Sequence, residues 1–362
     1  MVVHISFLLF LQTIKNQKPM KSVLVSIISG QTIPNLLLIK EFAGKFDELL
    51  FITSFEMEGR GNIADSRSRW IERSCKIAEG TTRRIEVAED CWADISEKLK
   101  SLNDDADVQY IVNLTGGTKI MTLAIFEYFA RRGNTIYYIP FPKNEYHELY
   151  PAKNKCHKLS YRCNLKEYLM AHGLHYTHNE ELLAPPAETL AFFEKVKKAN
   201  FDFQAVPEIV FAHDFLDKGK KAYYSGIWFE EYVYHKLREV FKLSVSNIAM
   251  GVKLVRDPKE VENDNEYDVM FIRSNTLHVI ECKGSAGRSK KASLDRYLYK
   301  LGAITKNFGL KVNTYLFTLT NLSDSYGNIL KNLDKGRQIL GIKGIFDQKF
   351  FDKSNEYIKQ LK

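Results

Sequence analysis

The sequence predicts an α/β protein built from two domains. Its 362 residues exceed the length over which one hydrophobic core usually grows, and 45% of them are hydrophobic. Strand-like and helix-like segments alternate between residues 22 and 142, and a strand hairpin follows a helical segment that starts at residue 226. We expect an N-terminal extension over residues 1–21, a first domain over 22–145, a helical connector over 146–221 and a second domain over 222–362.

Charge and cysteine content narrow the class of protein. The formal net charge is +8, and residues 201–362 carry 26 Lys and Arg against 20 Asp and Glu, which is compatible with a polyanionic partner. Five scattered cysteines indicate a reducing compartment rather than a disulfide framework. The apolar run over residues 2–11 is too short to span a bilayer and has no basic segment before it. We therefore expect a cytoplasmic protein without a membrane partner.

The first domain opens on residues 23–28, VLVSII, a run typical of a strand buried on both faces. The elements expected after it are a helix over 35–45, strands over 48–53 and 108–114, a helix over 121–132 and a strand over 135–139. Strands that alternate with helices in this way predict a mainly parallel, Rossmann-like sheet.

Two loops, residues 29–32 and 113–119, lie at the carboxyl ends of strands in this sheet. Ligands bind at that edge of such sheets. The second loop, residues 113–119, reads NLTGGTK and opens a helix, whose free N–H groups attract anions. Its glycines allow a ligand close to the backbone, and its hydroxyl and ammonium groups suit a phosphodiester or a nucleotide. A helix-capping turn with Thr115 or Thr118 as N-cap is the structural alternative. The candidate ligand-binding residues are Ser29, Gly30, Gln31, Thr32, Thr115, Gly116, Gly117, Thr118 and Lys119.

The paired loops, with NLTGGTK followed by a helix that starts MTLA, resemble the CARF domain of CRISPR-associated proteins over residues 22–145. The resemblance implies a Rossmann-like domain that dimerises and binds a cyclic oligoadenylate across the dimer axis. It also implies that the candidate loop residues contact this activator. A two-fold symmetric ring requires an isologous pair of subunits.

The connector is expected to hold two helices, over 165–172 and 187–199, and we favour a packed connector over a DNA-binding winged-helix remnant. Cysteines and histidines gather near its start, but their spacing fits no standard zinc finger and the histidines do not converge. We therefore expect no zinc site formed by Cys156, Cys163, His172, His175 and His178.

The second domain begins with a helix over residues 226–241. Helical periodicity places Glu230 with Ile227, Val233 and Leu237 on the apolar side and places Glu231 on the solvent side. An inward carboxylate is costly unless a cation or hydrogen bonds meet it. Glu230 is therefore a candidate functional residue, and Glu231 is expected to be an ordinary surface charge.

A hairpin follows, with strands over 265–272 and 276–283. Antiparallel pairing brings Asp268 to Glu281, and alternation puts Lys283 on the face of Glu281. Carboxylates grouped in this way suit Mg²⁺ or Mn²⁺, and Lys283 could orient or deprotonate a metal-bound water or stabilise the developing anion. A buried ion-pair network without metal is the alternative. The candidate metal ligands are Asp268, Glu281, Glu230 and the backbone carbonyl of Ile280 or Cys282.

The spacing D-x12-E-x-K, with G-x-W-F-E upstream, resembles the PD-(D/E)xK nuclease superfamily, although Tyr267 stands where that family often has proline. The resemblance implies a restriction-endonuclease-like α/β domain completed by a helix over 291–308 and a strand over 312–318. It implies catalytic roles for Glu230, Asp268, Glu281 and Lys283. Phosphate groups would pass beside the basic run of Arg288, Lys290 and Lys291.

Together, the two resemblances indicate the cyclic-oligoadenylate-activated nucleases of type III CRISPR systems. They imply a homodimer, switched on by cyclic tetra-adenylate, that cuts nucleic acid with little sequence preference using Mn²⁺ or Mg²⁺. DNA is the expected substrate, and RNA stays open as a second one. Two alternatives also stay open: a CARF-type regulator with an inactive nuclease-like domain, and an unswitched restriction or repair endonuclease.

Overall fold

The computed structural model divides into two compact units, Met1–Tyr161 and Arg162–Lys362. It describes residues 20–78, 80–102, 107–256, 266–284, 290–304, 308, 312–324, 326, 328–352, 356–359 and 361. The expected N-terminal extension therefore lies outside the described residues, apart from residues 20 and 21. The predicted α/β class is confirmed in both units, each of which is built around one mixed sheet.

The first unit holds a seven-stranded sheet of order β3-β2-β1-β4-β5-β6-β7. Neighbouring strands from β3 through β5 are parallel, and β6 and β7 add an antiparallel hairpin at one edge. The strands are β1 (Lys21–Ile27), β2 (Glu48–Thr53), β3 (Arg83–Glu86), β4 (Val108–Asn113), β5 (Thr135–Tyr138), β6 (Glu145–Tyr150) and β7 (Lys155–Lys158).

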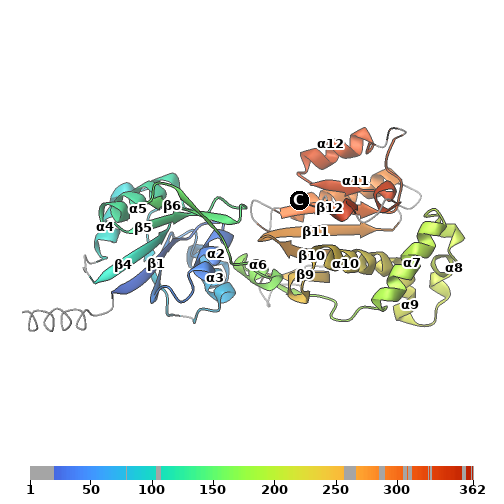
Figure 1. The fold of residues 1–362 in the computed structure, drawn as a ribbon, viewed down its shortest axis with the longest axis horizontal. Coiled ribbons are helices and arrows are strands. Elements are labelled where there is room, and N and C mark those ends of the chain that lie inside the picture. The colour runs from blue at the N-terminus through green and yellow to red at the C-terminus, as the bar shows by residue number, and fades with distance from the viewer. Residues whose placement is uncertain are drawn as a thin grey trace, which may run out of the picture. The chain divides into compact units, whose positions relative to one another are not determined.

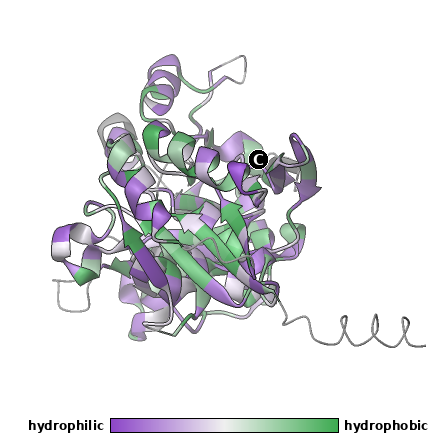
Figure 2. Cartoon of the chain, turned by 90° about the vertical axis from the view of Figure 1, so that its left-hand side faces the viewer, coloured by the Kyte–Doolittle hydropathy of each residue, from purple (hydrophilic) through white to green (hydrophobic). Residues whose placement is uncertain are grey.

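Helices cover both faces of this sheet, with α2 and α3 on one side and α4 and α5 on the other (Figure 1). They are α2 (Ile33–Glu41), α3 (Arg67–Cys75), α4 (Trp92–Lys100) and α5 (Lys119–Arg131). One core forms where Val25 and Ile27 of β1 meet Ile95 of α4 and Phe129 of α5. Figure 2, viewed from the side of this unit, shows strands largely in the green of apolar residues and helices banded in green and purple.

The second unit holds a six-stranded sheet of order β13-β12-β11-β10-β9-β8. The strands β8 to β11 pair antiparallel, and β11, β12 and β13 pair parallel. The strands are β8 (His175–Thr177), β9 (Ile248–Val255), β10 (Glu266–Arg273), β11 (Thr276–Lys283), β12 (Val312–Thr318) and β13 (Gly344–Phe346).

Helix α10 is the central helix of this unit, and a π-helical turn over Tyr223–Ile227 leads into it. One core joins Phe193 of α7 and Phe229 of α10 to Phe271 and Ile280 of the sheet. The helices are α6 (Leu165–Ala171), α7 (Pro186–Lys198), α8 (Pro207–Val210), α9 (Lys218–Ala222), α10 (Trp228–Phe241), α11 (Lys290–Ile304), α12 (Lys331–Ile339), α13 (Gln348–Asp352) and α14 (Glu356–Lys359).

Residues 146–221, expected as a helical connector, are instead shared between the two units. Residues 145–158 form the β6–β7 hairpin of the first sheet, whereas β8 joins the second sheet and α7 contributes to the second core. Neither expected helix stands apart, because α7 packs in the second core and α6 contacts β8 and β10 of the second sheet. Among the described residues, none of the helices combines the length and apolar character needed to cross a membrane.

Candidate functional site

The hairpin of β10 and β11 places an acidic pair at the end of its ladder. Pairing runs from Arg273↔Thr276 to Val269↔Ile280, so the next position sets Asp268 opposite Glu281. Beyond Val269 the backbone ladder stops, and the Cys282 N–H donates to Asp268 Oδ2 at 2.6 Å. The side chain of Asp268 therefore takes the place of a strand carbonyl, and the two strands open at this point.

A single ammonium group joins the two carboxylates. Lys283 Nζ lies 2.9 Å from Asp268 Oδ2 and 2.9 Å from Glu281 Oε1. The carboxylate side chains are only 10% and 3% exposed, so the cluster is well shielded from solvent. The structure thus brings together three of the four residues expected to be catalytic, and all three come from one hairpin.

Lys300 of α11 is a second cation that the motif did not indicate. Its Nζ donates to both oxygens of Glu281, at 3.2 and 2.9 Å, and to the backbone carbonyl of Glu266 at 2.8 Å. Lys300 therefore adds a second lysine to the cluster, beside the predicted Lys283. Lys300 fixes the orientation of Glu281, while Lys283 links it to Asp268.

Glu230, the fourth predicted catalytic residue, is half-buried on α10. Its carboxyl group is close enough to the cluster for the charges of Asp268, Glu281 and Lys283 to affect its pKa. Burial, followed by repulsion from Asp268, raises the pKa of Glu230 to about 8. Its carboxylate makes no hydrogen bond or ion pair with any residue that the structure describes. The positive charge of Lys283 offsets only part of this effect, so a further cation beside Glu230 would be stabilising.

Glu231 was expected on the solvent side and is instead completely buried. It accepts hydrogen bonds from the backbone N–H of Leu183 and from the hydroxyl of Thr189 on α7. The expectation was wrong because α10 is covered by α7 as well as by the sheet, so two of its sides are apolar. Glu231 ties these helices together and lies outside the candidate catalytic cluster.

Burial and neighbouring charges shift the pKa values of Asp268 and Lys283 and so affect which of these groups carries a proton. Burial, then the neighbouring Glu281, raises the pKa of Asp268 to about 6. Burial alone would lower the pKa of Lys283, but the carboxylates of Asp268 and Glu281 outweigh it and raise that pKa above its usual range. Lys283 is therefore a proton-bearing donor, which favours an orienting or anion-stabilising role over that of a base.

The cluster has the donor chemistry of a site for a hard divalent cation. Asp268, Glu281 and Glu230 supply carboxylate oxygens, and Mg²⁺ and Mn²⁺ prefer such ligands. The contacts of Asp268 with Lys283 and Cys282 both use Oδ2, which leaves Oδ1 for another partner. Burial first, and then repulsion by a neighbouring carboxylate, raises the pKa values of Glu230 and Asp268, and a bound cation would offset both effects.

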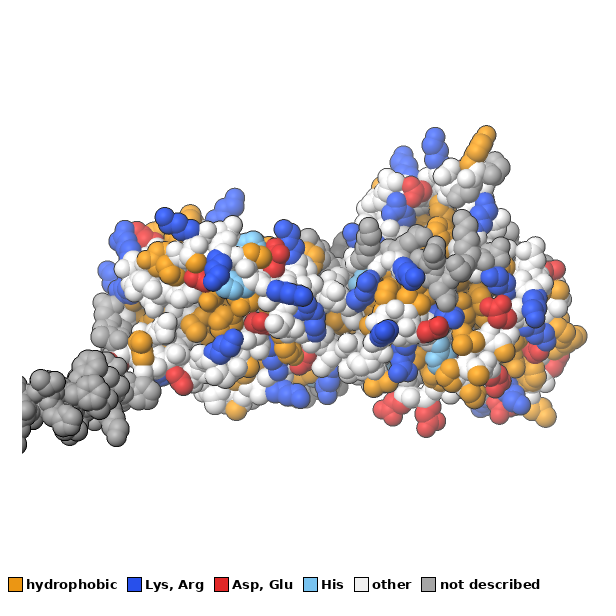
Figure 3. Space-filling model, viewed as in Figure 1, with side chains coloured by type: hydrophobic (Ala, Val, Ile, Leu, Met, Phe, Trp, Pro, Cys, Tyr) orange, Lys and Arg blue, Asp and Glu red, His pale blue; other side chains and the backbone are white. Residues whose placement is uncertain are grey.

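The predicted basic run lies largely beyond what the structure describes. Arg288 is outside the described residues, and only the backbone of Lys290 and Lys291 is described, as the start of α11. On the face seen in Figure 3, Lys and Arg side chains are scattered over both units among acidic ones, in agreement with the mild basic excess of the chain.

The two predicted ligand loops meet in the first unit. They follow β1 and β4, which are parallel neighbours in the sheet. From β1 the chain continues to β2 and β3 on one side of this pair, and from β4 it continues to β5 on the other side. This is the switch point at which open α/β sheets bind ligands. A Cβ added to Gly116 would lie 2.4 Å from Ser29 Oγ, so the two loops touch.

Loop residues divide into buried and exposed groups. Thr115 is buried and accepts the N–H of Ile139 at 2.8 Å, and Thr118 caps α5 by accepting the N–H of Met121. Thr32 is also buried, at the N-terminus of α2. The structural alternative of a capping turn therefore applies to Thr118. The exposed members are Gly30, Gln31, Gly117 and Lys119, with Ser29 and Gly116 half-buried.

A buried amide network that the sequence did not indicate supports both loops. Ser26 Oγ accepts from Asn35 Nδ2 at 2.9 Å and from Asn113 Nδ2 at 3.1 Å. Asn113 Oδ1 in turn accepts the N–H of Thr115 at 3.0 Å. The network links β1, α2 and β4, so the ends of both strands are held in one arrangement.

These two units define a sensor-type α/β domain joined to a nuclease-type domain with an Asp–Glu–Lys cluster. Residues 23–168 match the family model of the Card1 CARF domain, and residues 217–349 match that of the Card1-like endonuclease domain. The two models together cover most of the chain, so the chain is a Card1-like protein that joins a CARF domain to an endonuclease domain.

Solved structures share this two-domain fold at low sequence identity. Protein VC1899 from Vibrio cholerae aligns with a TM-score of 0.75 at 15% identity, over 94% of this chain and 97% of its own. Can2 from Sulfobacillus thermosulfidooxidans, solved in complex with cyclic tetra-adenylate, aligns with a TM-score of 0.72 at 18% identity, over 94% and 99%.

A third structure is a type III CRISPR defence DNA nuclease activated by cyclic oligoadenylate. It aligns with a TM-score of 0.59 at 17% identity, over 88% of this chain but only 52% of its own. No curated protein sequence matches the chain. At these identities the structural likeness establishes the fold, and the functional argument rests on the residues.

Proposed function

We propose that the protein is a metal-dependent nuclease that is switched on by a cyclic oligoadenylate, with cyclic tetra-adenylate as the expected activator, in type III CRISPR defence. The observation that carries the proposal is the position of Lys283 Nζ, 2.9 Å from both Asp268 and Glu281. The endonuclease domain match and the likeness to Can2 with its cyclic tetra-adenylate support it. The five free cysteines agree with action in the cytoplasm.

The hairpin residues would hold the metal and position the substrate. Asp268, Glu281 and Glu230, with the Cys282 carbonyl, are the proposed ligands. A divalent ion, when bound, lowers the pKa of a coordinated water and offsets charge on the phosphate. Lys283 keeps its proton and donates to the water or to a phosphate oxygen as negative charge develops. Lys300 keeps both oxygens of Glu281 in position.

The loops of the first unit would bind the activator. Gly117 and Lys119 are exposed beside the start of α5, where helix N–H groups and an ammonium favour phosphate. Gly30 and Gln31 lie on the adjoining loop. A ring with two-fold symmetry would engage the same loops from two subunits, so we also propose a homodimer. Binding must favour one arrangement of the nuclease units over another for activation to occur.

Cleavage assays with single-stranded DNA, plasmid DNA and RNA test the proposal. We expect cutting with Mn²⁺ or Mg²⁺ only when cyclic tetra-adenylate is present, and none after EDTA treatment. DNA is the expected substrate, and the RNA arm decides whether it is a second one. Tight activator binding without cleavage of any substrate would favour an inactive-nuclease regulator. Equal cleavage with and without the activator would favour an unswitched endonuclease.

A further inference from the structure

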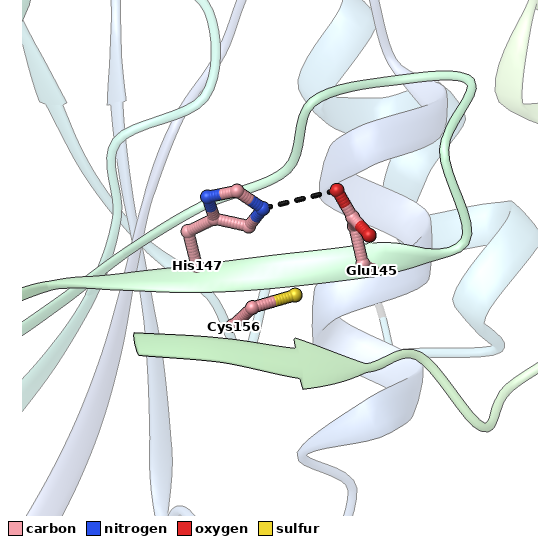
Figure 4. Close-up of side chains that lie close together, drawn as sticks. All are labelled: Glu145, His147 and Cys156. Carbon is pink, nitrogen blue, oxygen red and sulfur yellow. Dashed lines mark hydrogen bonds and ion pairs between the residues drawn. The ribbon is translucent and has the colours of Figure 1, made fainter. Parts of the chain in front are cut away.

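A second cluster of metal-ligand side chains lies in the first unit, on the β6–β7 hairpin at the sheet edge. Glu145 and His147 are two positions apart on β6 and share one face, and Cys156 pairs with His147 across the ladder. The ligand atoms of the three residues all lie within 4.8 Å of one another. Figure 4 shows the carboxylate, the imidazole and the thiol turned towards a common space.

The imidazole of His147 is oriented as in a metal ligand. Its Nδ1 lies 2.7 Å from Asn154 Oδ1, so the side-chain amide of Asn154 fixes the ring on this side. Its Nε2 lies 3.1 Å from Glu145 Oε1. The ring is thus held at both nitrogens, and one of them lies within 4.8 Å of both the carboxylate and the thiol. Ligating histidines are commonly fixed through their second nitrogen in this way.

The donor set selects the class of cation. Hard ions such as Mg²⁺ prefer oxygen alone, whereas a thiolate, an imidazole and a carboxylate suit Zn²⁺ and similar transition metals. We propose that Glu145, His147 and Cys156 bind one Zn²⁺-class ion, with a fourth position open to water or another ligand. The site is separate from the nuclease cluster, because it belongs to the other compact unit.

The opposite face of the same hairpin provides a contrast. There His157 lies 3.3 Å from Glu148 and stacks on Tyr146 with ring centroids 5.0 Å apart. No thiol joins that pair within the part of the chain that the structure describes. The histidine there has an aromatic packing partner, whereas His147 has two further ligand-type groups. The group of cysteines and histidines considered as a zinc site in the sequence analysis is divided between the two units. Cys156 belongs to the first unit, whereas Cys163, His172, His175 and His178 belong to the second.

Cobalt substitution in the full chain tests this site. Co²⁺ bound through a cysteine thiolate gives a near-ultraviolet charge-transfer band, which oxygen ligands alone do not produce. We expect this band at one equivalent of Co²⁺, its loss on adding Zn²⁺, and its loss in Cys156→Ser. His147→Gln should weaken Zn²⁺ affinity at least about 10-fold, measured by competition with a chelating dye.

Two control variants make the result specific. Cys91→Ser removes another exposed free cysteine of the same unit and should leave the band intact. Glu281→Ala disables the proposed nuclease site and should also leave it intact, so failure here and failure of the nuclease proposal are distinguishable. No thiolate band in the wild-type chain, or a band that survives Cys156→Ser with unchanged intensity, would overturn the proposal.

Discussion

The contact between the two ligand loops can be tested by adding one methyl group. Gly116 has φ +101°, and a Cβ at this position would lie 2.4 Å from Ser29 Oγ and 2.9 Å from Ser29 Cβ. The substitution Gly116→Ala therefore introduces both an unfavourable backbone conformation and a steric clash. Gly133→Ala is the matched control, because its φ is +73° and a Cβ there would meet no atom within 4 Å.

The two contributions have different sizes. A left-handed conformation costs an alanine roughly 1–2 kcal/mol. An overpacked contact adds roughly 1–3 kcal/mol, because the neighbouring loop must shift. Gly116→Ala should thus lower the free energy of unfolding by about 2–5 kcal/mol, against about 1–2 kcal/mol for Gly133→Ala. The melting temperature should fall on the order of 10 °C for Gly116→Ala.

Thermal and urea unfolding measure the backbone contribution and the steric contribution. The proteins compared are the two single variants and a double variant that combines Gly116→Ala with Ser29→Gly. Removing the Ser29 side chain takes away both clashing atoms, so the double variant should recover to the level of Gly133→Ala. Activator affinity should drop in Gly116→Ala, because the displaced loop carries proposed ligand contacts. Equal destabilisation by Gly116→Ala and Gly133→Ala, with no recovery in the double variant, would refute the loop contact.

Three further predictions concern the two units. Glu281→Ala should abolish cleavage and spare activator binding, whereas Lys119→Ala should weaken activation and leave divalent-metal binding intact; cleavage and calorimetry on both variants measure this. Lys300→Met should slow cleavage roughly 10- to 100-fold by releasing Glu281, while Lys253→Met, at an exposed lysine 3.9 Å from Glu266, should change the rate little. Glu231→Ala should lower the free energy of unfolding by about 1–3 kcal/mol in urea titrations, because a buried acceptor is lost.

Distinct outcomes would contradict each of these predictions. Undiminished cutting by Glu281→Ala would mean that the catalytic cluster is misplaced. Equal rates for the two lysine variants would remove the positioning role of Lys300. An unfolding midpoint unchanged in Glu231→Ala would show that the contact between α7 and α10 does not depend on this carboxylate.

Three strands could be predicted from the sequence to the residue, and β1, β4, β5 and β10 differ from their expected bounds by one or two residues. Expected bounds of 48–53, 276–283 and 312–318 match β2, β11 and β12. Each is an apolar run that ends at polar turn residues, so local pattern determines its limits. The β6–β7 hairpin was not predicted, because EYHELY and KCHK are polar, half-exposed edge segments whose strand character comes from pairing with β5.

The candidate active site was only partly predictable, because some of its contacts depend on tertiary packing and not on local sequence pattern. Asp268, Glu281 and Lys283 follow from hairpin register and two-residue alternation, which are local rules. Lys300 approaches from a separate helix, and only the packing of α11 reveals it. Glu231 was misassigned because a helical wheel assumes one apolar face, and α10 has two.

The position of a bound divalent cation tests the central claim most directly. Crystals of the full chain soaked in Mn²⁺ should show an anomalous peak at the open end of the hairpin, coordinated by Asp268 and Glu281, and the peak should be absent in Glu281→Ala. The account would be contradicted if Mn²⁺ supported cleavage but bound away from Asp268 and Glu281. In that case Lys283 would keep its contacts with both carboxylates.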